Sequence, residues 1–300
     1  MNASLGGRYA VGARGEAWAY VCGVCAARET AFLQPRTIEE LGGLAAGEVV
    51  QRLARTFMGT VESLSDFDRV AQRRQSAELA DILALSPSPL PVDLMRVREG
   101  AERMRAGLGE LPPRLDAASF AQALRDLSIR SGDFAAEFAA LFSRTWSDPG
   151  PEARAAASLV IDGAELEVVQ ALASVADDPV VEKWAGYRVG EGTARVADRA
   201  LKLGISRDML ADYFFRDALM SRKARDFLMD FNAQAAAAMY PEGVTPDNVE
   251  QRMLAVTAES TGNPFSAGRV VHYLQLFADQ IRRVRLAVYE ATGRIRKEAA

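Results

Sequence analysis

Residues 263–293 form the stretch NPFSAGRVVHYLQLFADQIRRVRLAVYEATG, which carries the clearest helical pattern in the chain. Six of its apolar side chains return alternately four and three positions apart: Val270, Leu274, Phe277, Ile281, Val284 and Val288. That spacing keeps all six on one face of an α-helix. Asn263 is expected to cap the helix, Pro264 to occupy its first turn and Gly293 to end it. The predicted helix has about 29 residues and a length of roughly 43 Å. Its apolar face must be covered by another helix of this chain or by a partner.

The same periodicity runs through much of the remaining sequence. Apolar residues recur every three or four positions over the ranges 17–32, 37–57, 67–85 and 117–142, and the alternation typical of strands is nearly absent. Thr37 to Glu40 has the form of a capping box, with Pro35 just upstream. Proline-rich breaks separate the helical ranges, and the stretch Ser86–Pro91 is expected to be an extended connector. We therefore expect an all-α protein.

A weak internal repeat runs across these breaks. Three prolines each open an Arg-containing helical segment, and each segment closes near a glycine: Pro91 with Gly107, Pro179 with Gly204, and Pro264 with Gly293. Proline at a helix start and glycine beyond a helix end are common in any helical protein, so the spacing alone is weak support for a structural repeat. We expect one all-helical domain over residues 1–300, which the repeat would divide into lobes 1–88, 89–176 and 177–300.

The composition excludes several classes of function. The 36 basic and 40 acidic residues give a net charge of −4, so no electrostatic excess is present to hold nucleic acid or an anionic membrane. The longest apolar stretch, Ala17–Ala27, has about 11 residues, whereas a membrane span needs roughly 20. We therefore expect a cytoplasmic protein without a transmembrane helix.

The pair Cys22 and Cys25 is the one motif with an established chemical meaning. Two thiols three residues apart can form a redox dithiol or half of a zinc site. The chain has no other cysteine, and His272 is its only histidine, so a complete zinc site would need carboxylates or a second subunit. The favoured interpretation is that both cysteines pack as small apolar residues in a helix face. His272 is similarly expected to be a partly buried structural residue.

Other residue types suggest chemistry only weakly. Paired carboxylates occur at Asp66 and Asp68, Glu165 and Glu167, and Asp177 and Asp178, where solvated caps are the favoured interpretation. Gly190 and Gly192 are not followed by the lysine and hydroxyl residue of a phosphate-binding loop. The basic residues on and after the last helix are expected to form a solvated face: Arg282, Arg283, Arg285, Arg294, Arg296 and Lys297. We predict no catalytic, cofactor-binding or metal-binding residues, and no cofactor.

The two ends of the chain resemble a known family. The stretches concerned are YAVGAR at Tyr9–Arg14, NPF at Asn263–Phe265, VVHYL at Val270–Leu274 and IRRVR at Ile281–Arg285. They resemble the opening and closing segments of V/A-type ATPase central-stalk linkers, a family that has both prokaryotic and eukaryotic members.

The middle of the chain resembles that family poorly. The sequence has Gly-Glu-Ala-Trp at residues 15–18, where the family continues with Arg-rich and Leu-Leu positions. The family's internal pattern of Asp, Asn and Arg is only faintly visible in residues 189–199. The closing run has Asp279 and Gln280 where the family typically has an acidic residue at or near position 280.

The resemblance implies a non-catalytic component of a rotary ATPase. Three helical lobes would form an elongated funnel on the membrane proteolipid ring, accept the foot of the rotating shaft and couple ATP-driven rotation to proton or sodium transport. The partners would be the shaft subunits and the proteolipid ring, so the chain would be peripheral to the inner face of the membrane and held there by protein contacts alone.

Two other classes of protein also fit the sequence. One is an all-helical adaptor or regulatory protein that binds a partner through the apolar face of its long C-terminal helix. The other is a dithiol or metal-dependent enzyme built on Cys22 and Cys25.

Overall fold

The chain is all-α wherever its structure is described. The computed structural model describes residues 15–97, 176–204 and 248–293, and isolated positions at 162, 165–166, 169–170, 172–174 and 245. These residues contain helices, turns and loops but no strand, which confirms the predicted fold class. None of the helices in the described ranges has the length and apolar character to cross a membrane.

The chain divides into two compact units. One, here called the terminal unit, combines Ala13–Val92 with Ser260–Ala300. The other, here called the central unit, combines Met1–Gly12 with Asp93–Glu259. The terminal unit therefore brings together stretches from both ends of the sequence. The predicted lobes 1–88, 89–176 and 177–300 follow the chain in order and stay a prediction.

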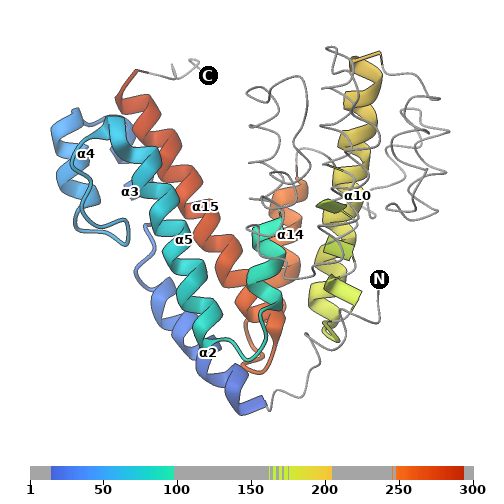
Figure 1. Cartoon of the computed structure of the whole chain (residues 1–300). Helices are drawn as coiled ribbons and strands as arrows, with labels where there is room; N and C mark the ends of the chain where they lie inside the picture. The colour runs from blue at the N-terminus through green and yellow to red at the C-terminus, as the bar shows by residue number, and fades with distance from the viewer. Residues whose placement is uncertain are drawn as a thin grey trace, which may run out of the picture. The chain divides into compact units, whose positions relative to one another are not determined.

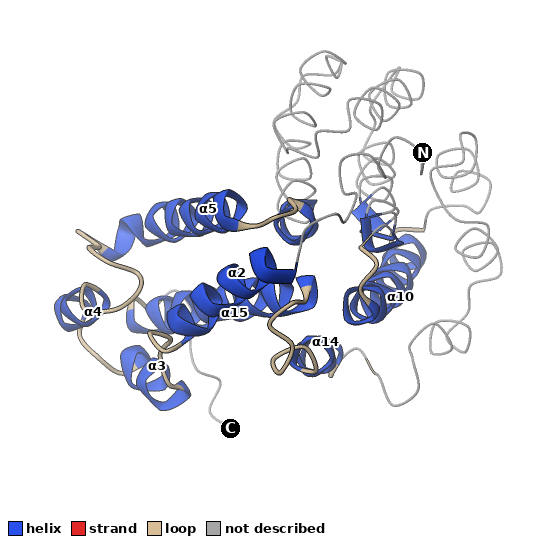
Figure 2. Ribbon diagram, turned by 90° about the horizontal axis from the view of Figure 1, so that it is seen from below, coloured by secondary structure: helices blue, strands red, loops and turns tan. Residues whose placement is uncertain are grey.

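The terminal unit is built around its last helix, α15. Its helices are α2 (Gly15–Glu29), α3 (Pro35–Gly42), α4 (Ala46–Leu53), the short 3-10 helix η1 (Leu64–Asp66), α5 (Phe67–Leu85) and α15 (Ala267–Ala291). α15 packs against α2, α3, α4 and α5 (Figure 1), and the view in Figure 2 shows α2 running alongside it. All six residues of the predicted apolar stripe on α15 are buried. Helices of this same chain therefore cover that face.

The start of α15 differs from the prediction. The helix begins at Ala267, and its cap is Ser266, whose hydroxyl accepts a hydrogen bond from the backbone N–H of Gly268 at 3.1 Å. The Asn263 side chain instead accepts from the N–H of Phe265 at 3.0 Å, so it closes the turn that precedes the helix. α15 consequently has 25 residues. Gly293 follows its end with a φ of 67°, a left-handed conformation that favours glycine.

The predicted range 37–57 contains two helices instead of one, because α3 ends at Gly42 and α4 covers only Ala46–Leu53. α3 begins at Pro35, two residues before Thr37, so the predicted capping box at Thr37 is wrong. A capping carboxylate is present at α4 instead, where Glu48 accepts a hydrogen bond from the N–H of Ala45 at 3.3 Å.

The other predicted ranges vary in their agreement with the structure. α5 spans the predicted range 67–85. For α2 the predicted range is 17–32, and the helix starts two residues before position 17 and ends three residues before position 32. The expected connector is extended or bent over residues 86–89, but residues 90–97 are helical. The predicted helical range 117–142 lies outside the described residues.

The central unit contains two described helices that pack together, α10 (Pro179–Lys202) and α14 (Val249–Ala258). Asp178 caps α10, because its Oδ1 accepts hydrogen bonds from the N–H groups of Val180 and Val181 at 3.0 and 3.2 Å. Gly204 follows the end of α10 with a φ of 66°. A proline start and a glycine end therefore frame α10 as the repeat predicts, whereas Pro264 lies outside α15.

Candidate functional site

A buried carboxylate lies at the centre of the terminal unit. Glu78, on α5, has no exposed surface and contacts side chains from three helices. Arg28 of α2 forms a close ion pair with it, Arg74 of α5 pairs with its Oε2 at 2.8 Å, and the Tyr273 hydroxyl of α15 donates to its Oε1 at 2.6 Å. We call these four residues the Glu78 cluster. Because a buried charge is costly unless it is paired, the cluster fixes α2, α5 and α15 to one another.

The cluster changes the proton affinities of its members. Burial raises the pKa of the Tyr273 hydroxyl, and the hydrogen bond to the Glu78 carboxylate raises it further. For Arg28, burial opposes the charged form, but the hydrogen bond and charge of Glu78 raise the pKa of the guanidinium above its ordinary value. Both groups therefore keep their protons at neutral pH, as the hydrogen bonds require.

An aromatic group borders the Glu78 cluster. Phe32 stacks on Tyr273 with ring centroids 5.8 Å apart, and Phe57 meets Phe277 edge to face at 5.5 Å. The Arg74 guanidinium lies 5.3 Å from the centre of the Phe277 ring, a distance suited to a cation–π contact. The rings and the ion pairs thus lie side by side in the packing of the terminal unit.

Two further residue pairs join α2 and the turn after it to α15. Arg269 pairs with both carboxylate oxygens of Glu29, at 2.5 and 2.8 Å. The Gln280 side chain accepts from the Leu33 N–H at 3.0 Å and donates to the Leu33 carbonyl at 3.2 Å. A carboxylate at position 280 could accept the first bond but could not donate the second. This pairing gives Gln280 a structural role.

Cys22 and Cys25 are buried on the inner face of α2 and are not joined by a disulfide. The Cys22 thiol donates to the Ser266 carbonyl at 3.7 Å, and burial raises its pKa. Burial raises the pKa of Cys25 to about 12. Such thiols stay protonated and inert at neutral pH, so both cysteines contribute to helix packing.

His272 also belongs to the core of the terminal unit. Its side chain is buried on α15, and the loss of hydration lowers its pKa, although the nearby charge of Glu29 acts in the opposite direction. Within the part of the chain that is described, no three His, Cys, Asp or Glu side chains are grouped so that they could hold a metal ion.

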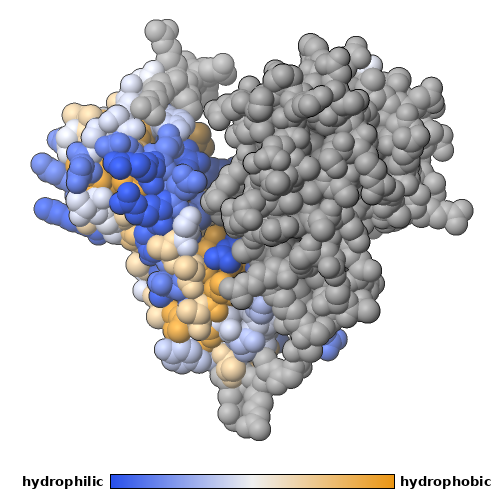
Figure 3. Space-filling view, in the orientation of Figure 1, coloured by the Kyte–Doolittle hydropathy of each residue, from blue (hydrophilic) through white to orange (hydrophobic). Residues whose placement is uncertain are grey.

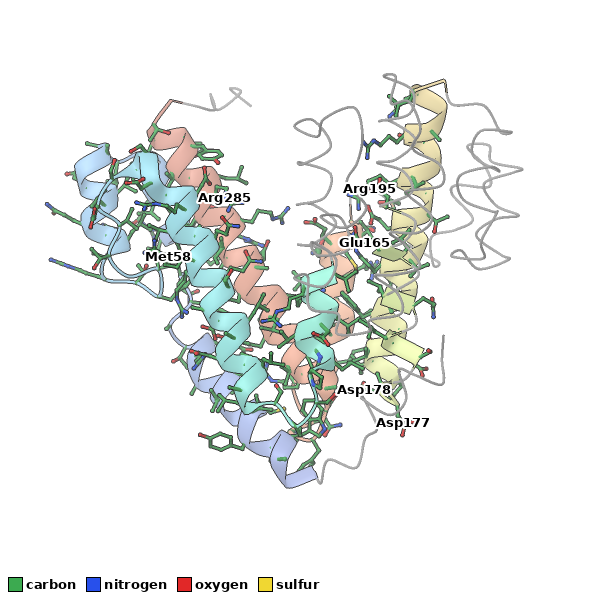
Figure 4. The ribbon with its side chains drawn as sticks, in the orientation of Figure 1. Met58, Glu165, Asp177, Asp178, Arg195 and Arg285 are labelled. Atoms are coloured by element: carbon green, nitrogen blue, oxygen red, sulfur yellow. The ribbon has the colours of Figure 1, made fainter. Side chains whose placement is uncertain are left out.

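The predicted carboxylate pairs have structural partners. Asp68 pairs with Arg285 at 2.9 Å and accepts from the Tyr289 hydroxyl at 2.7 Å, and Asp66 pairs with Arg69 at 3.3 Å. At the start of α10, where Figure 4 labels both Asp177 and Asp178, the Asp178 side chain is buried as the cap.

Its neighbour Asp177 is exposed, with a left-handed φ of 49°. Glu165 is buried in an ion pair, and Glu167 lies outside the described residues. Asp66, Asp68 and Glu165 thus act as ion-pair partners, and Asp178 acts as a helix cap.

The central unit has its own buried ion-pair cluster along α10. Arg188 is 8% exposed and contacts two carboxylates, Glu165 at 2.6 Å and Glu191 at 3.0 Å. Arg195 also pairs with Glu191, at 3.2 Å, and Figure 4 labels Glu165 and Arg195 near the same part of α10. Arg199 pairs with Asp162 at 3.0 Å and continues this row of ion pairs along α10. The row fastens the helical residues around position 165 to α10.

Gly192 lies on α10 next to this row, and a side chain there would collide with its neighbour. A Cβ built on Gly192 would lie 2.3 Å from Cδ2 of Leu166. The absence of a side chain at Gly192 therefore permits close packing between α10 and the helical residues around Leu166. This is a structural role and not phosphate binding. The phenylalanines Phe214, Phe215, Phe227 and Phe231, which the sequence indicates as core, lie outside the described residues.

The arginines of α15 are only partly a solvated face. Arg282 and Arg283 are about half exposed and share the carboxylate of Asp279, at 2.8 and 2.6 Å. Arg285 instead reaches Asp68 on α5. On the face shown in Figure 3, hydrophilic residues gather over α4 and the start of α5, whereas apolar residues gather nearer α2. Arg294, Arg296 and Lys297 lie outside the described residues.

Sequence reasoning missed the Glu78 cluster. A signal for it is present, because Glu78 occupies a position of the apolar stripe of α5 that also contains Phe67, Ala71 and Ile82. A single acidic residue in such a stripe indicates a buried partner, and Arg74 stands one helical turn before it. The partners on α2 and α15 could not be found this way, since they lie 50 and 195 residues away in the sequence.

No protein-family model matches this sequence. No curated protein matches it either.

Proposed function

We propose that this protein is a non-catalytic linker of a V/A-type rotary ATPase, which couples the rotating central shaft to the membrane proteolipid ring during proton or sodium transport. The carrying observation is the packing of α2 against α15 within the terminal unit. α15 contains two of the stretches that resemble the family, and α2 follows directly after the resembling stretch Tyr9–Arg14. The helix that follows the first resembling stretch thus packs against the helix that contains two of the others.

The way the polar core residues are used agrees with this proposal. A linker that transmits torque needs helices that are fixed to one another, and Glu78, Arg269 and Gln280 fix α2, α5 and α15 by ion pairs and hydrogen bonds. Cys22, Cys25 and His272, which offered routes to an enzyme, are buried in the same helix contacts. The funnel of three lobes and the peripheral membrane location are parts of the proposal.

The adaptor hypothesis loses its original basis. It required the apolar face of the C-terminal helix to receive a partner, but that face is buried by α2, α3 and α5 of the same chain. An adaptor would have to bind through another surface.

The first test is affinity purification of the tagged chain from its native host in mild detergent, followed by mass spectrometry. We expect shaft and proteolipid subunits to co-purify in amounts comparable to the tagged chain. A tag-only purification controls for adventitious binding. Recovery of proteins unrelated to a rotary ATPase would contradict the linker proposal.

A functional test asks whether ATP-driven ion transport requires this protein. In membrane vesicles from a strain that lacks the gene, ATP-driven ion transport should be lost, and the wild-type gene should restore it. Lys183→Ala is a matched control, because it removes only an exposed ion pair with Glu259 and should restore transport like the wild type. Unchanged ATP-driven transport in the deletion strain would contradict the proposal.

A further inference from the structure

We draw no further inference here: the strongest candidate, the uncharged outer face of α2 formed by Ala17, Tyr20, Gly23, Ala26 and Ala27, is an unpartnered apolar face, and nothing in the structure shows what covers it.

Discussion

Glu78 is a single residue that contacts side chains of α2, α5 and α15. Its carboxylate is fully buried and receives two guanidinium groups and a phenol hydroxyl. In the Glu78→Ala variant, these donors would face one another across a cavity without a compensating charge. We expect the free energy of unfolding to fall by about 3–5 kcal/mol, the range for removing one partner from a buried ion pair. Urea unfolding followed by circular dichroism measures this loss.

Asp81 provides a matched control on the same helix. It also contacts Arg28, at 3.5 Å, but its side chain is 59% exposed. Exposed ion pairs contribute little, so Asp81→Ala should change the free energy of unfolding by less than about 1 kcal/mol. If the two variants lost similar amounts of stability, Glu78 would not be the centre of the cluster.

Cys25 should make the folded state sensitive to alkaline pH. Burial raises the pKa of its thiol to about 12 in the folded protein, from an ordinary value of 9.0. Above pH 9 the unfolded chain therefore releases this proton while the folded chain retains it, so stability falls as pH rises from 9 towards 12. Between pH 8 and pH 10 this one group should reduce the free energy of unfolding by about 1.4 kcal/mol.

Urea unfolding of the wild type and the Cys25→Ala variant at both pH values tests this expectation. The variant lacks the thiol, so it should lose less of its stability between pH 8 and pH 10, even if it is less stable at pH 8. Burial is the largest cause of the raised pKa values of Tyr273 and Cys22, and because both groups are buried in both proteins, this part of their contribution cancels in the comparison. Equal pH dependence in the two proteins would show that the Cys25 thiol is not shielded.

At the scale of a helix, two glycines of α10 should respond to alanine in opposite directions. A Cβ at Gly192 would overlap the Leu166 side chain, whereas a Cβ at Gly186 would meet no atom within 4 Å. Overpacking should make Gly192→Ala less stable by about 1–3 kcal/mol. Gly186→Ala should be more stable by about 0.5–1 kcal/mol, because alanine loses less backbone freedom in a helix interior.

Thermal and urea unfolding of both variants measure these changes. Since the two positions lie on the same helix, general effects of alanine on helix formation are the same in both. A stabilising Gly192→Ala would mean that Leu166 does not pack tightly against α10.

The presence of the helices can largely be predicted from the sequence, whereas the residues at which they begin and end are harder to predict. The apolar period of α5 predicts its range because both ends coincide with changes in local pattern at Phe67 and Leu85. The start of α15 is predicted too early, since Asn263 and Pro264 suit either a helix start or the turn before one, and Ser266 provides a competing cap. The break between α3 and α4 at Gly42 and Gly43 is not predicted, because the apolar period continues across these two glycines.

At the scale of the whole chain, sequence periodicity shows that a helix has a face to bury but does not name its partner. The stripe on α15 is visible in the sequence, yet its burial against α2, α3 and α5 depends on contacts between residues more than 190 positions apart. The same limitation conceals the Glu78 cluster, whose members come from three helices. Pairings of this kind are set by the free energy of the assembled core, so local patterns carry little information about them.

These long-range contacts predict that the terminal unit survives a break in the chain just before α15. Gly262 lies in the exposed turn before α15 and has open space around it, so a specific protease site can be inserted there. After cleavage, the fragment beginning at residue 263 should co-elute with the rest of the protein in a 1:1 ratio on size exclusion. Its buried apolar face and the pairs Arg269–Glu29 and Tyr273–Glu78 should hold it in place.

Variants separate specific retention from nonspecific association of the cut fragment. Combining Glu78→Ala with Arg269→Ala removes the Tyr273–Glu78 hydrogen bond and the Arg269–Glu29 ion pair, and the cleaved fragment should then dissociate. Arg282→Ala, which removes only a half-exposed ion pair with Asp279, should leave the fragment bound. Release of the fragment from the cleaved wild type would contradict the packing of α15, whereas its retention by the double variant would show that the apolar face holds α15 without these two polar contacts.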